Sequence, residues 1–364
     1  MQLRNRLFAI ASALCAALAP LSGAAQVDFG SVFSKFKLEA RADAEVLSSD
    51  RDDATAYGMR GRYFNLMVGG DLGEGFSYYF RQRLKAEPGS IKFFDNTDFM
   101  WLNYQLSDQW RVRLGKDAMA VGGYEYDAAP IDVYMESEYW NNFYCFQLGA
   151  SVAYTTADGR QSFVAQVTQS PYIQTRGYEW NSGLLAYNFE WLGSIGQNVH
   201  TLFSTSMMQR DPGQKFVNLT VLGTQVAYGR WDSYLDLMHQ VLDADEWGKV
   251  WGVVWRCNYR LSPRWTLFAK FSHEENRSLV QDYSLPGSWF NEVDGLVPTS
   301  RVYSKAGLGV EFHPKGMQNV RLHGYVAMLH EDNLDQPVGT ADLNYLTCNL
   351  GFTWAVDVRN IFKK

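Results

Sequence analysis

The chain has 364 residues, of which 20% are charged and 15% aromatic, and its formal net charge is −6. This acidic balance excludes a chain built to bind nucleic acid, because such a chain needs a basic surface. One of the four cysteines falls in the first 25 residues and the other three, Cys145, Cys257 and Cys348, are widely spaced, so neither a disulfide framework nor a zinc site is indicated.

The first 25 residues have the layout of a secretory signal peptide. Arg4 and Arg6 are followed by an almost entirely apolar stretch over residues 7–21 and then by small residues up to Ala25. We expect cleavage after Ala25, which leaves residues 26–364 as one domain. Because the removed segment holds two basic residues and no acid, the mature chain changes from a net charge of −6 to −8.

A period of two dominates the rest of the chain. Between residues 35 and 46 every even position is apolar and every odd position is charged. Successive side chains of a strand point to opposite faces, so this run predicts a strand with one apolar and one polar face. The pattern recurs, and it predicts sixteen strands over residues 33–47, 57–70, 75–87, 96–107, 109–117, 143–156, 161–170, 179–192, 198–210, 215–228, 231–242, 247–260, 264–275, 301–313, 318–331 and 342–362.

The predicted strands are long enough to cross a bilayer when tilted, whereas no segment after Ala25 has the apolar length of a membrane helix. A chain that crosses lipid with strands must close into a barrel, since every backbone hydrogen bond has to be satisfied internally. Every second link is a tight turn, and the long links are residues 118–142 and 276–300. The sequence therefore predicts an all-β, sixteen-stranded antiparallel transmembrane barrel with short periplasmic turns and longer extracellular loops.

A soluble β-sandwich is the competing fold, because its strands alternate as well. Alternation over twelve residues and the many tryptophans and tyrosines near strand ends favour the barrel, in which aromatic residues line the two lipid–water interfaces. The predicted location is accordingly the outer membrane, with membrane lipid around the barrel.

We find no catalytic, metal-binding or cofactor pattern. The run His273-Glu274-Glu275 lacks the second histidine of a zinc-protease helix, and neither a nucleophile elbow nor a glycine-rich phosphate loop is present. We therefore expect neither an enzyme nor a cofactor. Two alternatives stay open: a barrel hydrolase whose site is assembled from distant loops, and a non-conducting barrel that anchors or binds a partner through Trp289 and Phe290 of the 276–300 loop.

The charge pattern points to passive transport. A barrel of sixteen strands is wide enough to hold a water-filled channel, and its polar faces line that channel. The polar faces of the first, third and fifth strands carry the basic residues Lys35, Lys37, Arg41, Arg81, Arg83, Lys85, Arg111 and Arg113. They predict a basic strip down one wall that attracts small anions. Arg60 and Arg62 are not assigned, because the inward face of the second strand is ambiguous.

The 118–142 loop is acidic, with Glu125, Asp127, Asp132, Glu136 and Glu138. If this third outer loop folds into the lumen, its carboxylates face the basic strip and create a transverse field. Arg81 and Arg83 then have loop acids as partners. An anion-selective pore and a pore of mixed charge preference are both consistent with the sequence.

The run Val112-Arg113-Leu114-Gly115-Lys116, followed by Gly122-Gly123-Tyr124-Glu125 and an aromatic-rich strand, resembles the phosphate-selective porin O and P family. This resemblance implies a trimeric outer-membrane porin whose third loop lies in the lumen. It also implies that Arg81, Arg83, Arg111 and Arg113 belong to an arginine ladder and that Lys116 lies near the constriction. Met119-Ala120-Val121 stands where the family usually has a proline.

Overall fold

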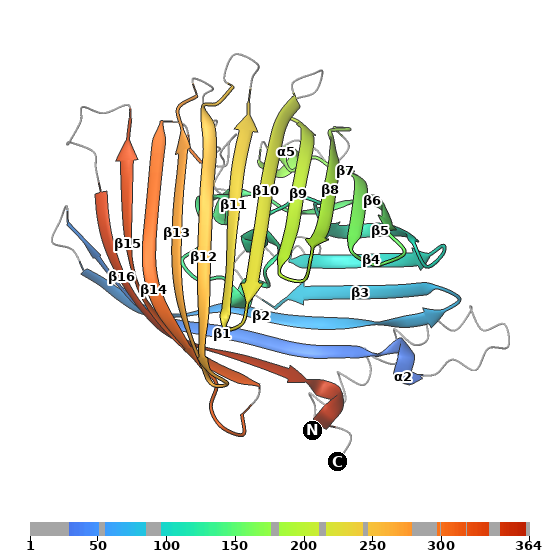
Figure 1. The fold of residues 1–364 in the computed structure, drawn as a ribbon, viewed down its shortest axis with the longest axis horizontal. Helices are drawn as coiled ribbons and strands as arrows, with labels where there is room; N and C mark the ends of the chain where they lie inside the picture. Colours follow the sequence, from blue (N-terminus) through green and yellow to red (C-terminus); the bar gives the residue numbers. More distant parts are fainter. Residues whose placement is uncertain are drawn as a thin grey trace.

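The computed structural model describes residues 29–50, 55–84, 96–175, 182–210, 216–242, 247–278, 297–298, 300–317, 319–334 and 343–361. Its sixteen antiparallel strands form one closed barrel, in which the first strand pairs with the last. In Figure 1, β9–β14 run steeply up the view while β1–β4 cross it almost horizontally, as expected for tilted strands on opposite walls. The strands are β1 (Lys35–Ser49), β2 (Thr55–Gly73), β3 (Phe76–Arg83), β4 (Thr97–Gln105), β5 (Trp110–Ala118), β6 (Phe146–Thr155), β7 (Gln161–Gln169), β8 (Leu185–Ile195), β9 (Val199–Gln209), β10 (Phe216–Tyr228), β11 (Trp231–Val241), β12 (Val250–Ser262), β13 (Trp265–Asn276), β14 (Arg301–Phe312), β15 (Val320–Asn333) and β16 (Leu343–Asp357).

The predicted sixteen-stranded barrel is confirmed, and so is its inverted polarity. Arg41 on β1 is only 1% exposed, whereas Leu350 on the neighbouring β16 is 68% exposed. A water-soluble sandwich would show the opposite distribution. The outer surface therefore suits lipid, and the polar faces of the strands point inward.

Two strands end earlier than the sequence pattern suggests. β3 ends at Arg83, and Lys85 lies outside the described residues. β16 ends at Asp357, whose carboxylate accepts hydrogen bonds from the backbone N–H and the guanidinium of Arg359. This local hydrogen bonding competes with the strand ladder. It accompanies the short helix η4 (Val358–Ile361), where the sequence predicts more strand.

The remaining helices in the described part of the chain are short. They are α2 (Phe29–Val32), α3 (Tyr124–Asp127), η2 (Pro130–Asp132), α4 (Glu138–Asn142) and α5 (Tyr172–Thr175). Among the described residues, no helix is long and apolar enough to span a membrane. Three of these helices follow β5 in the chain, in the segment that joins β5 to β6.

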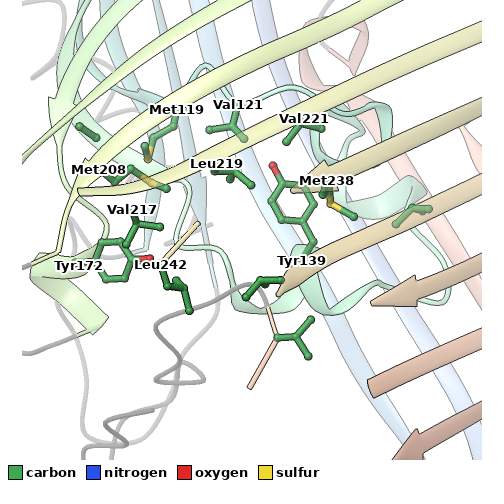
Figure 2. Packing of buried hydrophobic residues seen from close by; sticks show 14 residues of the cluster. Met119, Val121, Tyr139, Tyr172, Met208, Val217, Leu219, Val221, Met238 and Leu242 are labelled. Atoms are coloured by element: carbon green, nitrogen blue, oxygen red, sulfur yellow. The ribbon is translucent and has the colours of Figure 1, made fainter. Parts of the chain in front are cut away.

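The polarity of β10 differs from that of the other strands. Val217, Leu219 and Val221 on its inner face are fully buried, whereas Asn218 and Thr220 share its outer face with the exposed Leu222. The inner apolar side chains pack in one cluster with Met119, Val121 and Tyr139 of the β5–β6 segment (Figure 2). This apolar patch inside the barrel gives the segment a surface against which to bury its own apolar side chains.

Candidate solute pathway

The β5–β6 loop, residues 119–145, contacts side chains from both halves of the barrel. One set of contacts involves its main chain between residues 131 and 136. Each of these six successive carbonyl oxygens accepts a hydrogen bond from a cationic side chain of a strand. In order, the donors are Arg321, Arg256, Arg41, Lys270 for two successive oxygens, and Lys305. We call these six carbonyls and five donors the carbonyl latch.

The carbonyl latch surrounds the ring of Tyr134, which is fully buried. Phe268 stacks on this ring with 5.0 Å between the ring centroids. The guanidinium carbons of Arg41, Arg256 and Arg321 lie 4.7, 5.4 and 5.7 Å from the ring centroid. Arginines suit this position because a guanidinium donates hydrogen bonds in its plane while its face packs on an aromatic ring.

Two carboxylates hold the loop on either side of the carbonyl latch. Asp236 on β11 accepts the backbone N–H groups of Tyr124 and Glu125, at 2.8 and 2.9 Å. Glu274 on β13 accepts those of Glu138 and Tyr139, at 2.8 and 2.7 Å. These amides belong to the first turns of α3 and α4 and have no partner within the helices, so the carboxylates satisfy them.

The sequence suggested that the acidic residues of the loop face the basic strip, but most of them do not. Most of them bind other parts of the barrel: Glu125 pairs with Lys270, Asp132 with Arg321, and Glu136 with Arg62. Glu138 accepts a hydrogen bond from Asn142. Cations of β2, β13 and β15 lie within ion-pair distance of Glu125, Asp132 and Glu136, which are therefore paired there rather than with the basic strip.

A chamber of about 620 Å³ lies between the other side of the loop and the wall formed by β3–β8. Eight charged residues line it, four basic and four acidic. They are Arg81, Arg83, Arg111, Arg113, Asp98, Asp117, Asp127 and Glu190. Asp127 is therefore the loop acid that lines the chamber, and the chamber-lining residues of β3–β5 comprise four arginines and two aspartates.

The arginines of the chamber differ in how far they are neutralised. Arg81 and Arg83 share Asp98 of the neighbouring strand, with Nε–O distances of 2.9 and 2.8 Å. Their partner is thus a strand residue rather than a loop acid. Arg113 pairs with Asp117 at 2.6 Å. Arg111 has no carboxylate oxygen within ion-pair distance among the residues that the structure describes.

The lysines of the predicted strip do not line the chamber. Lys116 is 8% exposed and does not contribute to the chamber wall. Lys37 lies near the end of β1, where its Cα is opposite that of Asp357, and Lys85 falls outside the described residues. Gly115, next to Lys116, has a φ of 130°, and a Cβ there would come within 2.2 Å of the carbonyl oxygen of Met100. The glycine of the recognised motif is therefore required by the close approach of two strands.

The environment of the chamber affects the charge of the loop groups that face it. Asp127 is exposed to the water of the chamber but is still surrounded by protein, and this loss of bulk hydration raises the pKa of its carboxyl above the ordinary value of 3.8. Burial raises the pKa of the Cys145 thiol to about 11, so this thiol is neutral at physiological pH.

Sequence reasoning did not assign several residues that contact the loop. Arg256, Lys270, Lys305 and Arg321 alternate with outward apolar residues, which would have placed them on the inner face. Arg62 carried no such signal, because β2 contains one extra residue opposite the Arg41–Ala42 pair of β1. This bulge reverses the alternation within β2.

Comparisons with known proteins agree with this architecture. The model of the phosphate-selective porin O and P family matches residues 35–354. Among solved structures, an anion-selective porin from Comamonas acidovorans is 12% identical, with a TM-score of 0.59 over 88% of this chain and 98% of that chain. OprB of Pseudomonas putida is 12% identical, with a TM-score of 0.57 over 88% of this chain and 94% of that chain. A loop-deletion variant of the outer-membrane protein OmpT of Vibrio cholerae is 11% identical, with a TM-score of 0.55 over 88% of this chain and 98% of that chain.

At these identities the structural likenesses show the fold, and a comparison with curated proteins finds no match. The family model, in contrast, spans the barrel from its first strand to its last. The chain therefore belongs to the phosphate-selective porin O and P family, and it is a porin of the outer membrane.

Proposed function

We propose that small anions cross the outer membrane passively through the chamber between the β5–β6 loop and the arginine-bearing wall. The observation that carries this proposal is the separation of charge across the chamber. The chamber lining from strands β3–β5 holds four arginines and two aspartates, whereas the other acidic side chains of the lining are Asp127 of the loop and Glu190 of β8. An anion is attracted to the arginine side and repelled from the other.

Arg111 carries the largest share of this attraction. Arg81, Arg83 and Arg113 already donate to carboxylates, so they offer an anion less of their charge. Arg111 has no such partner among the described residues and lines the same chamber. Because four acidic side chains line the chamber beside the four arginines, we expect a moderate preference for anions rather than exclusion of cations.

Reversal potentials in planar bilayers test the proposal. With a salt gradient of potassium chloride across the membrane, the sign of the potential at zero current gives the preference between chloride and potassium ions. We expect chloride to be preferred at neutral pH. A preference for potassium rules out the anion path. A folded barrel with no conductance instead favours the alternative of a surface-binding or anchoring barrel.

We also propose that the barrel functions as a homotrimer and without catalysis, as the family resemblance implies. Cross-linking of the folded protein in detergent followed by mass determination distinguishes a trimer from a monomer. Among the described residues, no group of three or more histidine, cysteine, aspartate or glutamate side chains is arranged to hold a metal ion. Hydrolysis of ester or peptide substrates by the purified barrel would revive the hydrolase alternative.

A further inference from the structure

The chamber is lined by aromatic rings as well as charges. Phe99 of β4 and Phe146 at the start of β6 lie on the barrel side. Tyr126, Trp140 and Phe143 lie on the loop side, where the rings of Tyr126 and Phe143 meet edge to face at 5.8 Å. A solute in the chamber therefore has apolar ring surface on both sides.

The rings on the barrel side are in contact with the arginines. The guanidinium of Arg81 lies 4.4 Å from the ring centroid of Phe99 and 5.3 Å from that of Phe146. The guanidinium of Arg83 lies 5.5 Å from the ring centroid of Phe146. The two rings touch each other edge to face at 5.1 Å. Cationic groups and flat apolar surfaces thus alternate over one continuous patch.

This patch is poorly suited to inorganic phosphate. A phosphate dianion loses a large hydration free energy on leaving water, and only several unpaired donors can replace it. Arg81, Arg83 and Arg113 already bind Asp98 or Asp117, and rings donate nothing to phosphate oxygens. The carboxylate of Asp127, on the loop side, repels a doubly charged ion more strongly than a singly charged one.

A flat organic monocarboxylate fits the same patch. One guanidinium suffices to bind its single carboxylate, and that of Arg111 has no ion-pair partner in the part of the chain that the structure describes. Its ring gains contact with Phe99 and Phe146, and offset or edge-to-face contacts between rings are favourable beyond the burial of area. A chamber of about 620 Å³ is in the usual range for small organic ligands.

We propose that the chamber preferentially binds aromatic monocarboxylates, of which benzoate is the simplest, over inorganic phosphate and over small aliphatic carboxylates. This inference rests on the proposed anion path, since it names the class of solute that the path favours. This preference differs from the one expected for a ladder of unpaired cations, because most of the favourable contacts with the solute come from the aromatic rings.

Competition in planar bilayers tests the preference. Benzoate, acetate, cyclohexanecarboxylate and phosphate are added separately, and the concentration that halves the chloride current is measured for each. We expect the half-blocking concentration of benzoate to be about five-fold lower than that of acetate, which corresponds to one favourable ring contact. Cyclohexanecarboxylate has a similar size but no aromatic ring, so its half-blocking concentration should lie between the two.

Isothermal titration calorimetry of the folded barrel in detergent measures the same preference without any current. If the barrel binds benzoate but does not conduct, the proposed path fails while the binding preference stands. If the barrel conducts and benzoate binds no better than acetate or cyclohexanecarboxylate, or phosphate binds best, the preference for aromatic carboxylates is overturned and the path stands.

Two variants and a control locate the site. Phe99→Leu and Phe146→Leu keep an apolar side chain but remove the flat ring, so each should raise the dissociation constant of benzoate towards that of cyclohexanecarboxylate. Phe163→Leu is the matched control, because Phe163 lies on the outer face of β7, stacked with Trp191. An equal loss of benzoate affinity in all three variants would contradict a site in the chamber.

Discussion

Glu274 Oε1 on β13 accepts a hydrogen bond of 2.7 Å from the backbone N–H of Tyr139, which lies 135 residues earlier in the chain. Its other oxygen accepts the N–H of Glu138. One side chain therefore satisfies two amides at the start of α4, and it does so from a different part of the barrel. Removing one of these acceptors should loosen the loop without removing any apolar contact.

We predict that Glu274→Gln lowers the free energy of unfolding by about 1–3 kcal/mol, because an amide has one acceptor oxygen and leaves one buried N–H without a partner. Unfolding by urea in lipid vesicles, followed by tryptophan fluorescence, measures this change. Glu331→Gln is the control, since Glu331 lies at the end of β15 in a looser ion pair with Arg301, at 3.6 Å. A loss of stability as large in the control would show that α4 is not held by Glu274.

We predict strong coupling between Lys270 and Glu125, which form a buried ion pair. Lys270→Met leaves the carboxylate without its cation and two latch carbonyls without their donor, so it should cost about 3–5 kcal/mol. Lys270→Met combined with Glu125→Gln should cost less than the sum of the two single changes. The free energies of unfolding of the four proteins in a double-mutant cycle measure this difference, and strictly additive values would argue against the pair.

We predict that Arg111→Gln reduces the permeability ratio of chloride to potassium by up to about five-fold at low salt, since it removes a cation that has no carboxylate within ion-pair distance among the described residues. Arg81→Gln should have a smaller effect, because Arg81 shares Asp98 with Arg83. Reversal potentials at 0.1 M and 1 M salt compare the variants, and the difference should shrink at 1 M through screening.

Arg264→Gln provides the control for these measurements, because Arg264 is exposed in the turn between β12 and β13. Equal effects of Arg81→Gln and Arg111→Gln would mean that the carboxylate partners do not decide how much charge an anion experiences.

We predict that anion preference decreases as the pH rises through the pKa of Asp127. This pKa lies above 3.8, so the folded protein holds the proton over a pH range in which the unfolded chain has lost it. The contribution of the Asp127 carboxyl to folding stability is therefore complete when the pH is below its pKa in the unfolded chain. This contribution decreases as the pH rises through its pKa in the folded protein. Over the same range the chamber gains a negative charge.

Reversal potentials measured from pH 4 upwards should reveal this step, and Asp127→Asn should remove it. Glu190 and Asp117 line the same chamber and also titrate, so any step that persists in Asp127→Asn belongs to them. An unchanged profile in the variant would exclude Asp127 as the group responsible.

We predict that Gly115→Ala prevents normal folding. A methyl group at this position meets the carbonyl oxygen of Met100 at 2.2 Å, and the backbone has a φ that is unfavourable for alanine. Gly58→Ala is the matched control, because it adds a methyl group to β2 with no heavy atom within 4 Å. The fraction of protein that migrates as a compact barrel on an unheated gel should fall for Gly115→Ala and stay unchanged for Gly58→Ala.

Period-two alternation made the barrel predictable from sequence. Each strand carries its own signal, and β1 shows it with apolar residues at every even position between 35 and 46. Alternation no longer indicates which side chains face inward where a strand contains an extra residue. The bulge in β2 is such a place, and the inward direction of Arg62 was therefore not predicted. Alternation also misleads at β10, where Val217, Leu219 and Val221 face inward because the loop covers them.

The pairing of charges was beyond sequence reasoning for a different reason. The inward direction of Arg81 and Arg83 follows from alternation, but their shared partner Asp98 lies at an irregularity in the β3–β4 register. The partners of the loop acids depend on where the loop packs, which is decided by the apolar patch of β10 and by the carbonyl latch. Neither is visible as a local pattern.

The carbonyl latch also constrains the order of assembly. Four of its five donors lie between 124 and 190 residues after the carbonyls that they bind. Contacts between such distant positions form late, because the intervening chain must first be ordered. The loop can therefore reach its final position, and narrow the lumen, only when the strands that carry these four donors are in place.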